Sequence, residues 1–340
     1  MLRQPVPTLV IFTARIILSA TLDITMITLT KRHFLQSHEW ALFQQKLGKK
    51  VFERQGEGWR YLAILEQGDG KIGRHFTRLY TPYGPSYDSN QALHEALRDL
   101  EELATKNNID YVRVEPLSTN QLALTQLADY HKMSKSFQPA LTWMLDLAPG
   151  FETVKSGIHR SSRYRWNRVE RDGITFTISY EEKDLDDFIK MMGATSDRTK
   201  AQFRNGEYFK KMLEELGPSK VAGIAYAKQA NESLVGVLFL DDFDAQTRYY
   251  MYTGAFDKAR KFGANAPLVV FLIKDAIEKG LTCFDFFGIA PLDDTNHKWA
   301  GFSVFKRSFG GMDIAFSGTW EKAIKPTKYK AMTFARKFGR

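Results

Sequence analysis

Two adjacent cations, Lys306 and Arg307, lie within residues 301–311, whose sequence GFSVFKRSFGG contains three phenylalanines and ends in a glycine pair. If the phenylalanines are ordinary core residues, both cations point to solvent. If the aromatic side chains instead fix the backbone, Lys306 faces a cleft, where an ammonium group stabilises negative charge that develops on a substrate. The stretch therefore predicts either a solvated basic turn or a catalytic lysine.

A second candidate for chemistry is the segment RKFGANA, residues 260–266, which follows a predicted strand and opens a predicted helix. It resembles the acyl-donor loop of GCN5-related N-acetyltransferases, in which R-x-x-G-x-G/A lets backbone N–H groups at a helix N-terminus hold a pyrophosphate. Arg260 would then bind the donor. Asn265 replaces the final small residue of that pattern, and a plain helix-entry loop is the alternative.

Residues 157–173 form a third group, which carries five arginines among aromatic residues: Arg160, Arg163, Arg165, Arg168 and Arg171. On a helix, three of them fall broadly on one side. Such a run is usually a solvated face. The functional alternative is contact with the phosphates of a polyanion, which gives salt-dependent affinity.

Composition sets the context for these groups. The 340 residues are 44% hydrophobic and 13% aromatic, and 48 Lys and Arg exceed 39 Asp and Glu to give a charge of +9. These values are typical of a folded protein with an anionic partner. The single cysteine, Cys283, lies in an apolar run, so we expect a core residue in a reducing compartment. Neither C-x-x-C nor H-E-x-x-H occurs, and we expect no metal site.

The elements that must position these residues alternate between helices and strands, which indicates an α/β (α+β) protein. We expect a first domain at 26–149, a second at 150–330 after the punctuation by Pro149 and Gly150, and a basic tail at 331–340. The apolar run near the start is interrupted by Arg15 and is too short to span a bilayer. We interpret residues 1–25 as an upstream extension outside the fold, with a membrane-surface anchor as the alternative. The predicted helices cover 38–47, 91–106, 151–171, 185–195, 207–216 and 265–279, and the strands 59–65, 75–81, 110–114, 173–179, 219–227, 234–241, 247–252 and 283–287.

The order of eight short motifs resembles that of the FemABX family of peptidoglycan-bridge aminoacyltransferases, from about residue 34 to residue 329. The motifs are FLQSHEW, LYTPYGP, VEP, RYRWNRVERDG, FRNGEYF, YYMYTGA, FDFFGI and FKRSFGG. The resemblance implies two tandem GCN5-like domains without a long helical arm. It also implies an aminoacyl-tRNA donor, a UDP-linked or lipid-linked muramoyl pentapeptide as acceptor, and no cofactor.

The resemblance assigns roles on the donor side. Lys306 matches the lysine that contacts the donor and steadies the reacting ester, and Phe305 and Arg307 belong to the same motif as substrate-binding residues. An aminoacyl ester is already activated, so the reaction needs positioning and charge stabilisation, without ATP or an enzyme nucleophile. Glu115 of VEP is the candidate general base of the protein. The carboxylates of the acceptor are the alternative.

On the acceptor side, Arg204 and Tyr208 match a pair that lines the acceptor site, with the arginine toward its phosphates, and Tyr252 matches an aromatic residue of the same cleft. The chain departs from the family pattern at Gln44 and Tyr83, which stand where some members have a lysine and an arginine. These departures leave open how the acceptor's anionic groups are held.

Two rival functions remain open at this stage. An acyl-CoA-dependent N-acyltransferase would use the Arg260 loop, and a non-catalytic RNA- or membrane-binding protein would explain the charge alone. For the aminoacyltransferase we expect a cytoplasmic monomer, with peripheral contact at the inner membrane face as a further expectation.

Overall fold

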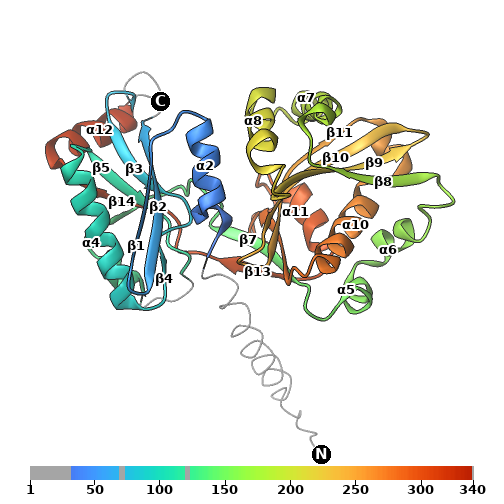
Figure 1. Cartoon of the computed structure of the whole chain (residues 1–340), viewed down its shortest axis with the longest axis horizontal. Helices are drawn as coiled ribbons and strands as arrows, with labels where there is room; N and C mark the ends of the chain where they lie inside the picture. The colour runs from blue at the N-terminus through green and yellow to red at the C-terminus, as the bar shows by residue number, and fades with distance from the viewer. Residues whose placement is uncertain (1–31, 69–72, 119–122, 339–340) are drawn as a thin grey trace, which may run out of the picture.

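The computed structural model describes residues 32–68, 73–118 and 123–338, and the expected extension at 1–25 lies outside them. Two mixed sheets lie side by side, each covered by helices (Figure 1). The expected α/β (α+β) class with two layered units is therefore confirmed.

The first sheet has seven strands among the described residues, in the order β1-β2-β3-β5-β14-β6, with β4 beside β2. The β3–β5 pair is parallel and the other pairs are antiparallel. The strands are β1 (Val51–Gly56), β2 (Trp59–Gln67), β3 (Thr77–Thr81), β4 (Ser86–Tyr87), β5 (Tyr111–Val114), β6 (His131–Lys132) and β14 (Trp320–Ala323).

The helices of this domain begin where the sequence offers a cap. Ser37 accepts a hydrogen bond from the backbone N–H of Trp40 at the start of α2, and Ser89 accepts one from Ala92 at the start of α4. Helix α4 buries one apolar side against the sheet, while α2 lies on the side that faces α8 of the second domain (Figure 1). The helical elements are η1 (Phe34–Gln36), α2 (His38–Lys46), α4 (Asn90–Lys106), η2 (Ala123–Leu127) and α12 (Pro326–Phe338).

The second sheet also has seven described strands, in the order β13-β7-β12-β11-β10-β9-β8, and only its β11–β12 pair is parallel. Helices α7 and α8 pack on one face of this sheet, and α5, α6 and α10 on the other. The strands are β7 (Leu141–Asp146), β8 (Ile174–Ser179), β9 (Ala222–Gln229), β10 (Glu232–Asp242), β11 (Thr247–Ala255), β12 (Cys283–Gly288) and β13 (Met312–Ala315).

One predicted helix, at 151–171, is instead two short ones. The backbone turns extended at Ile158, with ψ 141°, and a new helix begins after His159. The remaining helical elements of the domain are α5 (Phe151–Gly157), α6 (Arg160–Trp166), η3 (Glu182–Asp184), α7 (Asp186–Thr199), α8 (Gly206–Leu216), α9 (Lys258–Phe262), α10 (Asn265–Glu278) and α11 (Ala300–Arg307).

The sheets do not follow the expected linear split at Pro149. Strand β7 precedes that residue but pairs with β12 and β13 of the second sheet, and β14 returns to the first sheet near the end of the chain. The expected basic tail is also wrong for its described part, because residues 326–338 form α12 on the first domain. Lys328 and Arg336 of this helix make ion pairs with Asp110 and Glu321. These pairings join residues far apart in sequence, which local patterns do not reveal.

A continuous apolar cluster joins the two domains. It combines Phe34, Trp40 and Phe43 of the first domain with side chains of α7, α8 and β10, such as Phe188 and Phe209. The longest helix of the described residues, α4, has 17 residues, and no long helical arm projects from this part of the chain. None of the described helices is both long and apolar enough to cross a bilayer.

Candidate functional site

Lys306 points into the protein. It lies near the end of α11, is 8% exposed, and its Nζ donates a 2.7 Å hydrogen bond to the carbonyl of Gly288. Phe309 is buried in the core, Phe305 is half-buried against it, and the exposed Phe302 holds its ring centroid 4.8 Å from the Lys306 Nζ. The aromatic residues thus fix α11 and direct the lysine inward, so the interpretation in which Lys306 points to solvent is wrong.

The acceptor of this hydrogen bond lies in a distorted part of β12. The register of β12 against β7 shifts between Asp285 and Gly288, and Phe287 has φ 63°. A bulky residue in the left-handed region is a genuine outlier, and bulges of this kind commonly re-aim groups beside functional sites. Here the bulge presents both the Gly288 carbonyl and the Asp285 side chain near α11.

Asp285 is the carboxylate whose charge acts on Lys306. It is 1% exposed, and its Oδ1 accepts hydrogen bonds of 2.5 Å from the Thr142 hydroxyl and 2.6 Å from the Phe287 N–H. Burial raises the pKa of Asp285 to about 6, against the opposing effects of Thr142, of the Phe287 N–H and of the Lys306 charge. The group is therefore ionised at neutral pH and negative where it faces the lysine.

Burial also lowers the pKa of the Lys306 ammonium to about 8, and the charge of Asp285 partly counters this shift. An ammonium has three N–H donors, yet Lys306 makes one hydrogen bond within the described part of the chain. A buried cation with unused donors is costly unless a ligand completes its shell. The arrangement suits a group that binds a developing oxyanion.

Arg307 and Ser303 hold the segment that follows β12. The Arg307 guanidinium donates a 2.6 Å hydrogen bond to the Ala290 carbonyl, and its carbon lies 5.5 Å from the Trp143 ring centroid. The Ser303 hydroxyl accepts a 2.8 Å bond from the Ala290 N–H. Both contacts are internal, so Arg307 anchors the wall of the Lys306 site in this structure rather than facing a ligand.

The expected acceptor residues do come together. Arg204 precedes α8 and lies 5.1 Å above the Tyr208 ring, measured from the guanidinium carbon to the ring centroid. Burial and then the neighbouring Tyr252 raise the pKa of Tyr208 well above its ordinary value, while Arg204 lowers it. Tyr252 in turn packs edge-on against Phe209, with centroids 5.0 Å apart. Because Asn205 caps α8 by accepting from the Tyr208 N–H, the spacing of this pair is fixed by the helix start.

This tyrosine group and the Lys306 site adjoin the same interdomain cluster. Tyr208, Tyr252 and Phe287 all pack against the apolar cluster that joins the domains. Phe287 is the residue directly before the Gly288 carbonyl that binds Lys306. Both groups thus border the same interdomain cluster.

Glu115 has a different environment from the one expected for a general base. It is 3% exposed and accepts hydrogen bonds from the Tyr80 hydroxyl at 2.5 Å, the backbone N–H groups of Phe137 and Gln138, and the Thr319 hydroxyl. Both of its oxygens are occupied by protein donors. This carboxylate ties loops of the first domain together, and we do not assign it the proton.

The departures noted at Gln44 and Tyr83 are both buried positions. The Tyr83 hydroxyl donates a 2.8 Å bond to the Pro139 carbonyl. Neither side chain offers a free cation to an acceptor phosphate.

Arg260 lies apart from these groups. It is an exposed residue of α9, and no hydrogen bond, ion pair or ring contact among the described residues links it to Lys306 or to Tyr208. Gly263 ends α9 in the left-handed region at φ 60°. The expected donor loop is present as a helix connection, separate from the lysine site.

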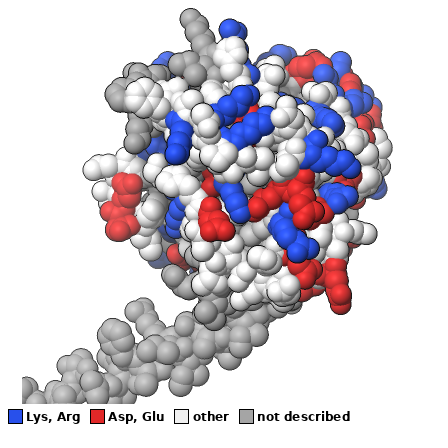
Figure 2. All heavy atoms as spheres, turned by 90° about the vertical axis from the view of Figure 1, so that its left-hand side faces the viewer, with Lys and Arg blue, Asp and Glu red and all other residues white. Residues whose placement is uncertain are grey.

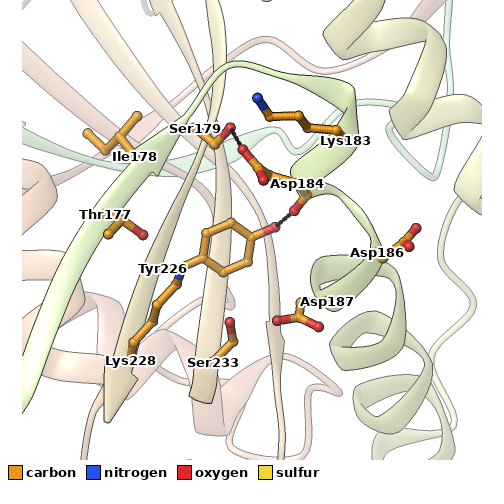
Figure 3. A pocket seen from close by; sticks show the side chains of 10 residues that line it. All are labelled: Thr177, Ile178, Ser179, Lys183, Asp184, Asp186, Asp187, Tyr226, Lys228 and Ser233. Atoms are coloured by element: carbon orange, nitrogen blue, oxygen red, sulfur yellow. Dashed lines mark hydrogen bonds between the residues drawn. The ribbon is translucent and has the colours of Figure 1, made fainter. Parts of the chain in front are cut away.

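Figure 3 shows a hollow of about 290 Å³ between β8, β9 and the start of α7. Three of its polar residues bind one another, since Asp184 accepts from the Ser179 hydroxyl through its carboxylate and from the Tyr226 hydroxyl through its carbonyl. It contains none of the predicted site residues. We therefore do not place the reaction there.

Sequence reasoning missed Asp285 and the bulge. The available signal was an acid inside the otherwise apolar run CFDFF, residues 283–287, because a buried charge needs partners. Nothing local marks Phe287 as left-handed, since that conformation usually belongs to glycine.

Known proteins resemble this chain both in sequence pattern and in fold. The FemAB family model matches residues 126–233 and 220–337, together more than half of the chain. The crystal structure of FemX superposes with a TM-score of 0.78 at 17% identity, covering 89% of this chain and 96% of that one. The structure of L-PGS from Bacillus licheniformis gives 0.56 at 17% identity, covering 88% and 92%. A domain of a putative lysylphosphatidylglycerol synthetase from Agrobacterium fabrum gives 0.57 at 13%, covering 87% and 92%. No curated protein matches the chain significantly by sequence.

Proposed function

Because this chain belongs to the FemAB family, we propose that it is an aminoacyltransferase that moves an amino acid from aminoacyl-tRNA to the stem-peptide amine of a peptidoglycan precursor. The observation that carries the proposal is Lys306, a buried ammonium with unused donors beside the bulge of β12. A lysine in this setting supports a reaction in which negative charge appears on a carbonyl oxygen.

The chemistry is a single acyl transfer. The neutral amine of the acceptor attacks the ester carbonyl carbon of the donor, a C–N bond forms, and the C–O bond to the ribose breaks. The amine loses one proton and the departing ribose oxygen gains one, so no cofactor is consumed. The enzyme contributes a geometry in which the reacting atoms lie about 3–3.5 Å apart.

Lys306 stabilises the oxygen that becomes negative in the tetrahedral intermediate. Its lowered pKa, about 8, still leaves it protonated at neutral pH. Asp285 acts as a positioning residue, since its charge favours the ammonium form and its own orientation is fixed by Thr142. Losing one such oxyanion donor costs about 2.7–4 kcal/mol of barrier.

The proton of the attacking amine needs an acceptor. Glu115 is saturated by internal donors, and Asp285 is held by Thr142 and the bulge. We therefore assign the proton to a carboxylate of the acceptor peptide itself, the alternative that remained from the sequence.

The tyrosine group supports binding of the acceptor. Arg204 is exposed, carries a full charge and stacks on Tyr208, which suits a diphosphate or lipid-linked diphosphate. Tyr252 packs beside this pair, against Phe209. We propose that the enzyme is a monomer in the cytoplasm, where donor and precursor are both present. When the acceptor is lipid-linked, we expect peripheral contact with the inner face of the membrane.

The test is amino-acid transfer from a pool of charged tRNAs to UDP-linked and to lipid-linked muramoyl pentapeptide. Wild type is compared with Lys306→Met, which keeps the length of the side chain, and with Lys298→Met, an exposed lysine of the preceding loop. We expect wild type to transfer an amino acid to at least one acceptor. Lys306→Met should lower the transfer rate about 100- to 1,000-fold, and Lys298→Met should leave it unchanged.

Transfer that survives Lys306→Met would remove the lysine from the mechanism. Absence of transfer to both acceptors, together with tight binding of CoA, would overturn the aminoacyltransferase in favour of the acyl-CoA class. Absence of any transfer with RNA binding retained would leave the non-catalytic function.

A further inference from the structure

Two groups that the sequence marks separately meet in one hollow of the second domain. The hollow, about 430 Å³, lies between the arginine-rich helix α6 with the turn after it and the helix α9 of the Arg260 loop. Its lining is Tyr164, Arg165, Arg168, Arg171, Asp172, Gln229, Lys261 and Phe262. Four cations thus face a single carboxylate, which leaves the hollow with a clear positive excess.

The cations differ in how far they are already engaged. Arg168 donates to the Tyr164 hydroxyl and pairs with Asp172, and Arg171 also approaches Asp172. Arg165 and Lys261 take part in no ion pair within the part of the chain that the structure describes. These two exposed cations are available for an anionic partner.

Gly263 shapes this hollow. A Cβ atom added there would fall 1.6 Å from a terminal nitrogen of the Arg165 guanidinium, so this arginine lies directly against Gly263. Gly263 also ends α9 in the left-handed region, which glycine adopts without strain. The Arg260 loop therefore lies against a cation of α6, which its donor-loop pattern did not predict.

An exposed aromatic ring completes the surface. Tyr164 is 58% exposed, and the Arg168 guanidinium carbon lies 5.1 Å from its ring centroid. Cations along a groove with an accessible aromatic face are the features with which proteins bind single-stranded nucleic acid, since phosphates meet the cations and bases stack on the ring. A deep apolar pocket of the kind that encloses a small ligand is not what these residues form.

The hollow is also connected to the lysine site through α6. The N–H of His159, which caps this helix, donates a 2.7 Å bond to the carbonyl of Ser308, two residues after Lys306. Helix α6 has 7 residues, so at 1.5 Å a residue its axis is about 10 Å long. One short helix thus leads from the reacting group to the cations.

Charge on the other side of the molecule is arranged differently. Figure 2 looks at the first-domain side, where Lys and Arg are interspersed with Asp and Glu. Lys322 and Lys328 pair there with Glu101 and Asp110. A polyanion gains less on such a face than at α6.

We propose that the α6–α9 hollow binds the RNA backbone of the aminoacyl-tRNA donor near its single-stranded end, with Arg165 and Lys261 on phosphates and Tyr164 under a base. This inference rests on the proposed function. It adds the surface that delivers the ester to Lys306, and it predicts recognition by charge and stacking rather than by base identity.

The experiment measures binding of uncharged total tRNA to the full chain by fluorescence anisotropy from 50 to 200 mM salt. Wild type is compared with the double variant Arg165→Ala, Lys261→Ala and with Arg98→Ala, a matched loss of an exposed arginine on the first domain. We expect the double variant to bind at least about 10-fold more weakly at the lowest salt. We also expect its slope of log K against log salt to be shallower by about 1.4–1.8, for two phosphates lost. Arg98→Ala is expected to match wild type.

In the transfer assay the double variant is expected to raise KM for the donor with little change in kcat, because neither cation touches the reacting atoms. Unchanged tRNA affinity and salt slope, with transfer intact, would overturn the hollow but leave the proposed function standing. If wild type neither binds tRNA nor transfers an amino acid, the proposed function itself is wrong. If anionic vesicles or CoA bind in a manner that the double variant abolishes, while tRNA binding is unaffected, the hollow serves one of those ligands and the inference is wrong.

Discussion

Replacing Lys306 by methionine separates a functional lysine from a structural one, because the two roles predict stability changes of opposite sign. Methionine keeps the unbranched chain and removes the charge. In the native protein the ammonium is almost fully buried, donates to the Gly288 carbonyl and interacts with Asp285. Removing a lysine that stabilises the fold lowers the free energy of unfolding, whereas removing one retained for catalysis does not.

The magnitude follows from the pKa. Burial lowers the pKa of Lys306 from 10.5 to about 8, and at 1.36 kcal/mol for each pKa unit the charged form is destabilised by about 3 kcal/mol at pH 7. Against this gain, the variant leaves the Gly288 carbonyl without its donor, which costs about 1–3 kcal/mol. We therefore expect Lys306→Met to be between unchanged and about 2 kcal/mol more stable than wild type at pH 7.

The pH dependence gives the sharper assay. Since the folded pKa of Lys306 lies below its unfolded value, the native state releases its proton first as the pH rises, and the stability of wild type increases above pH 8. Between pH 7 and pH 9 wild type is expected to gain about 1.4 kcal/mol relative to Lys306→Met, measured by urea unfolding at both values. Lys298→Met, at an exposed position, is expected to show no such difference from wild type.

The reasoning is refuted if Lys306→Met loses more than about 2 kcal/mol at both pH values and the gap to wild type does not change with pH. That result would make Lys306 a structural contact between α11 and β12, without a catalytic role.

Three further predictions concern groups around this site and the fold that holds it. The transfer rate should fall as the pH rises through about 8, where Lys306 loses its charge, and Asp285→Asn should move this limb to lower pH because the carboxylate raises the lysine pKa; rate profiles from pH 6 to 10 test both. Arg204→Ala should raise KM for the acceptor by about 10-fold, the loss of roughly 1.4 kcal/mol of ground-state binding, with kcat unchanged. Glu321→Gln should destabilise the first domain by about 3–5 kcal/mol in urea unfolding, since it leaves the fully buried guanidinium of Arg113 without its counter-charge.

Elements with a strong local signal were predicted well. Helices α4, α8 and α10 begin within a residue of their expected starts, because amphipathic spacing identifies the first two and a long apolar run the third. The Arg204–Tyr208 pair was named from the family resemblance, and the structure places the guanidinium carbon of Arg204 5.1 Å from the centroid of the Tyr208 ring.

Features that depend on distant pairing were not predicted. Strand β14 reaches the first sheet from the far end of the chain to pair with β5, and no periodicity in residues 320–323 specifies that partner. Asp285 and Lys306 are 21 residues apart and meet only because α11 folds back over the bulge of β12. The lysine was singled out by its surrounding residue types and given a role by the family resemblance, whereas Asp285, which partly counters the fall in its pKa, was not found.

The bulge and the buried lysine are best understood as one device. Phe287 in the left-handed region and a desolvated ammonium are two separate costs, and each lies within two residues of the Gly288 carbonyl or binds to it. The conformation of Phe287 directs its N–H to Asp285, which fixes the carboxylate, and the carboxylate keeps Lys306 more basic than burial alone allows. A regular strand would leave Asp285 without that donor and would turn the Gly288 carbonyl elsewhere. The strained backbone therefore acts on the lysine through Asp285, whose charge offsets part of the pKa decrease that burial causes.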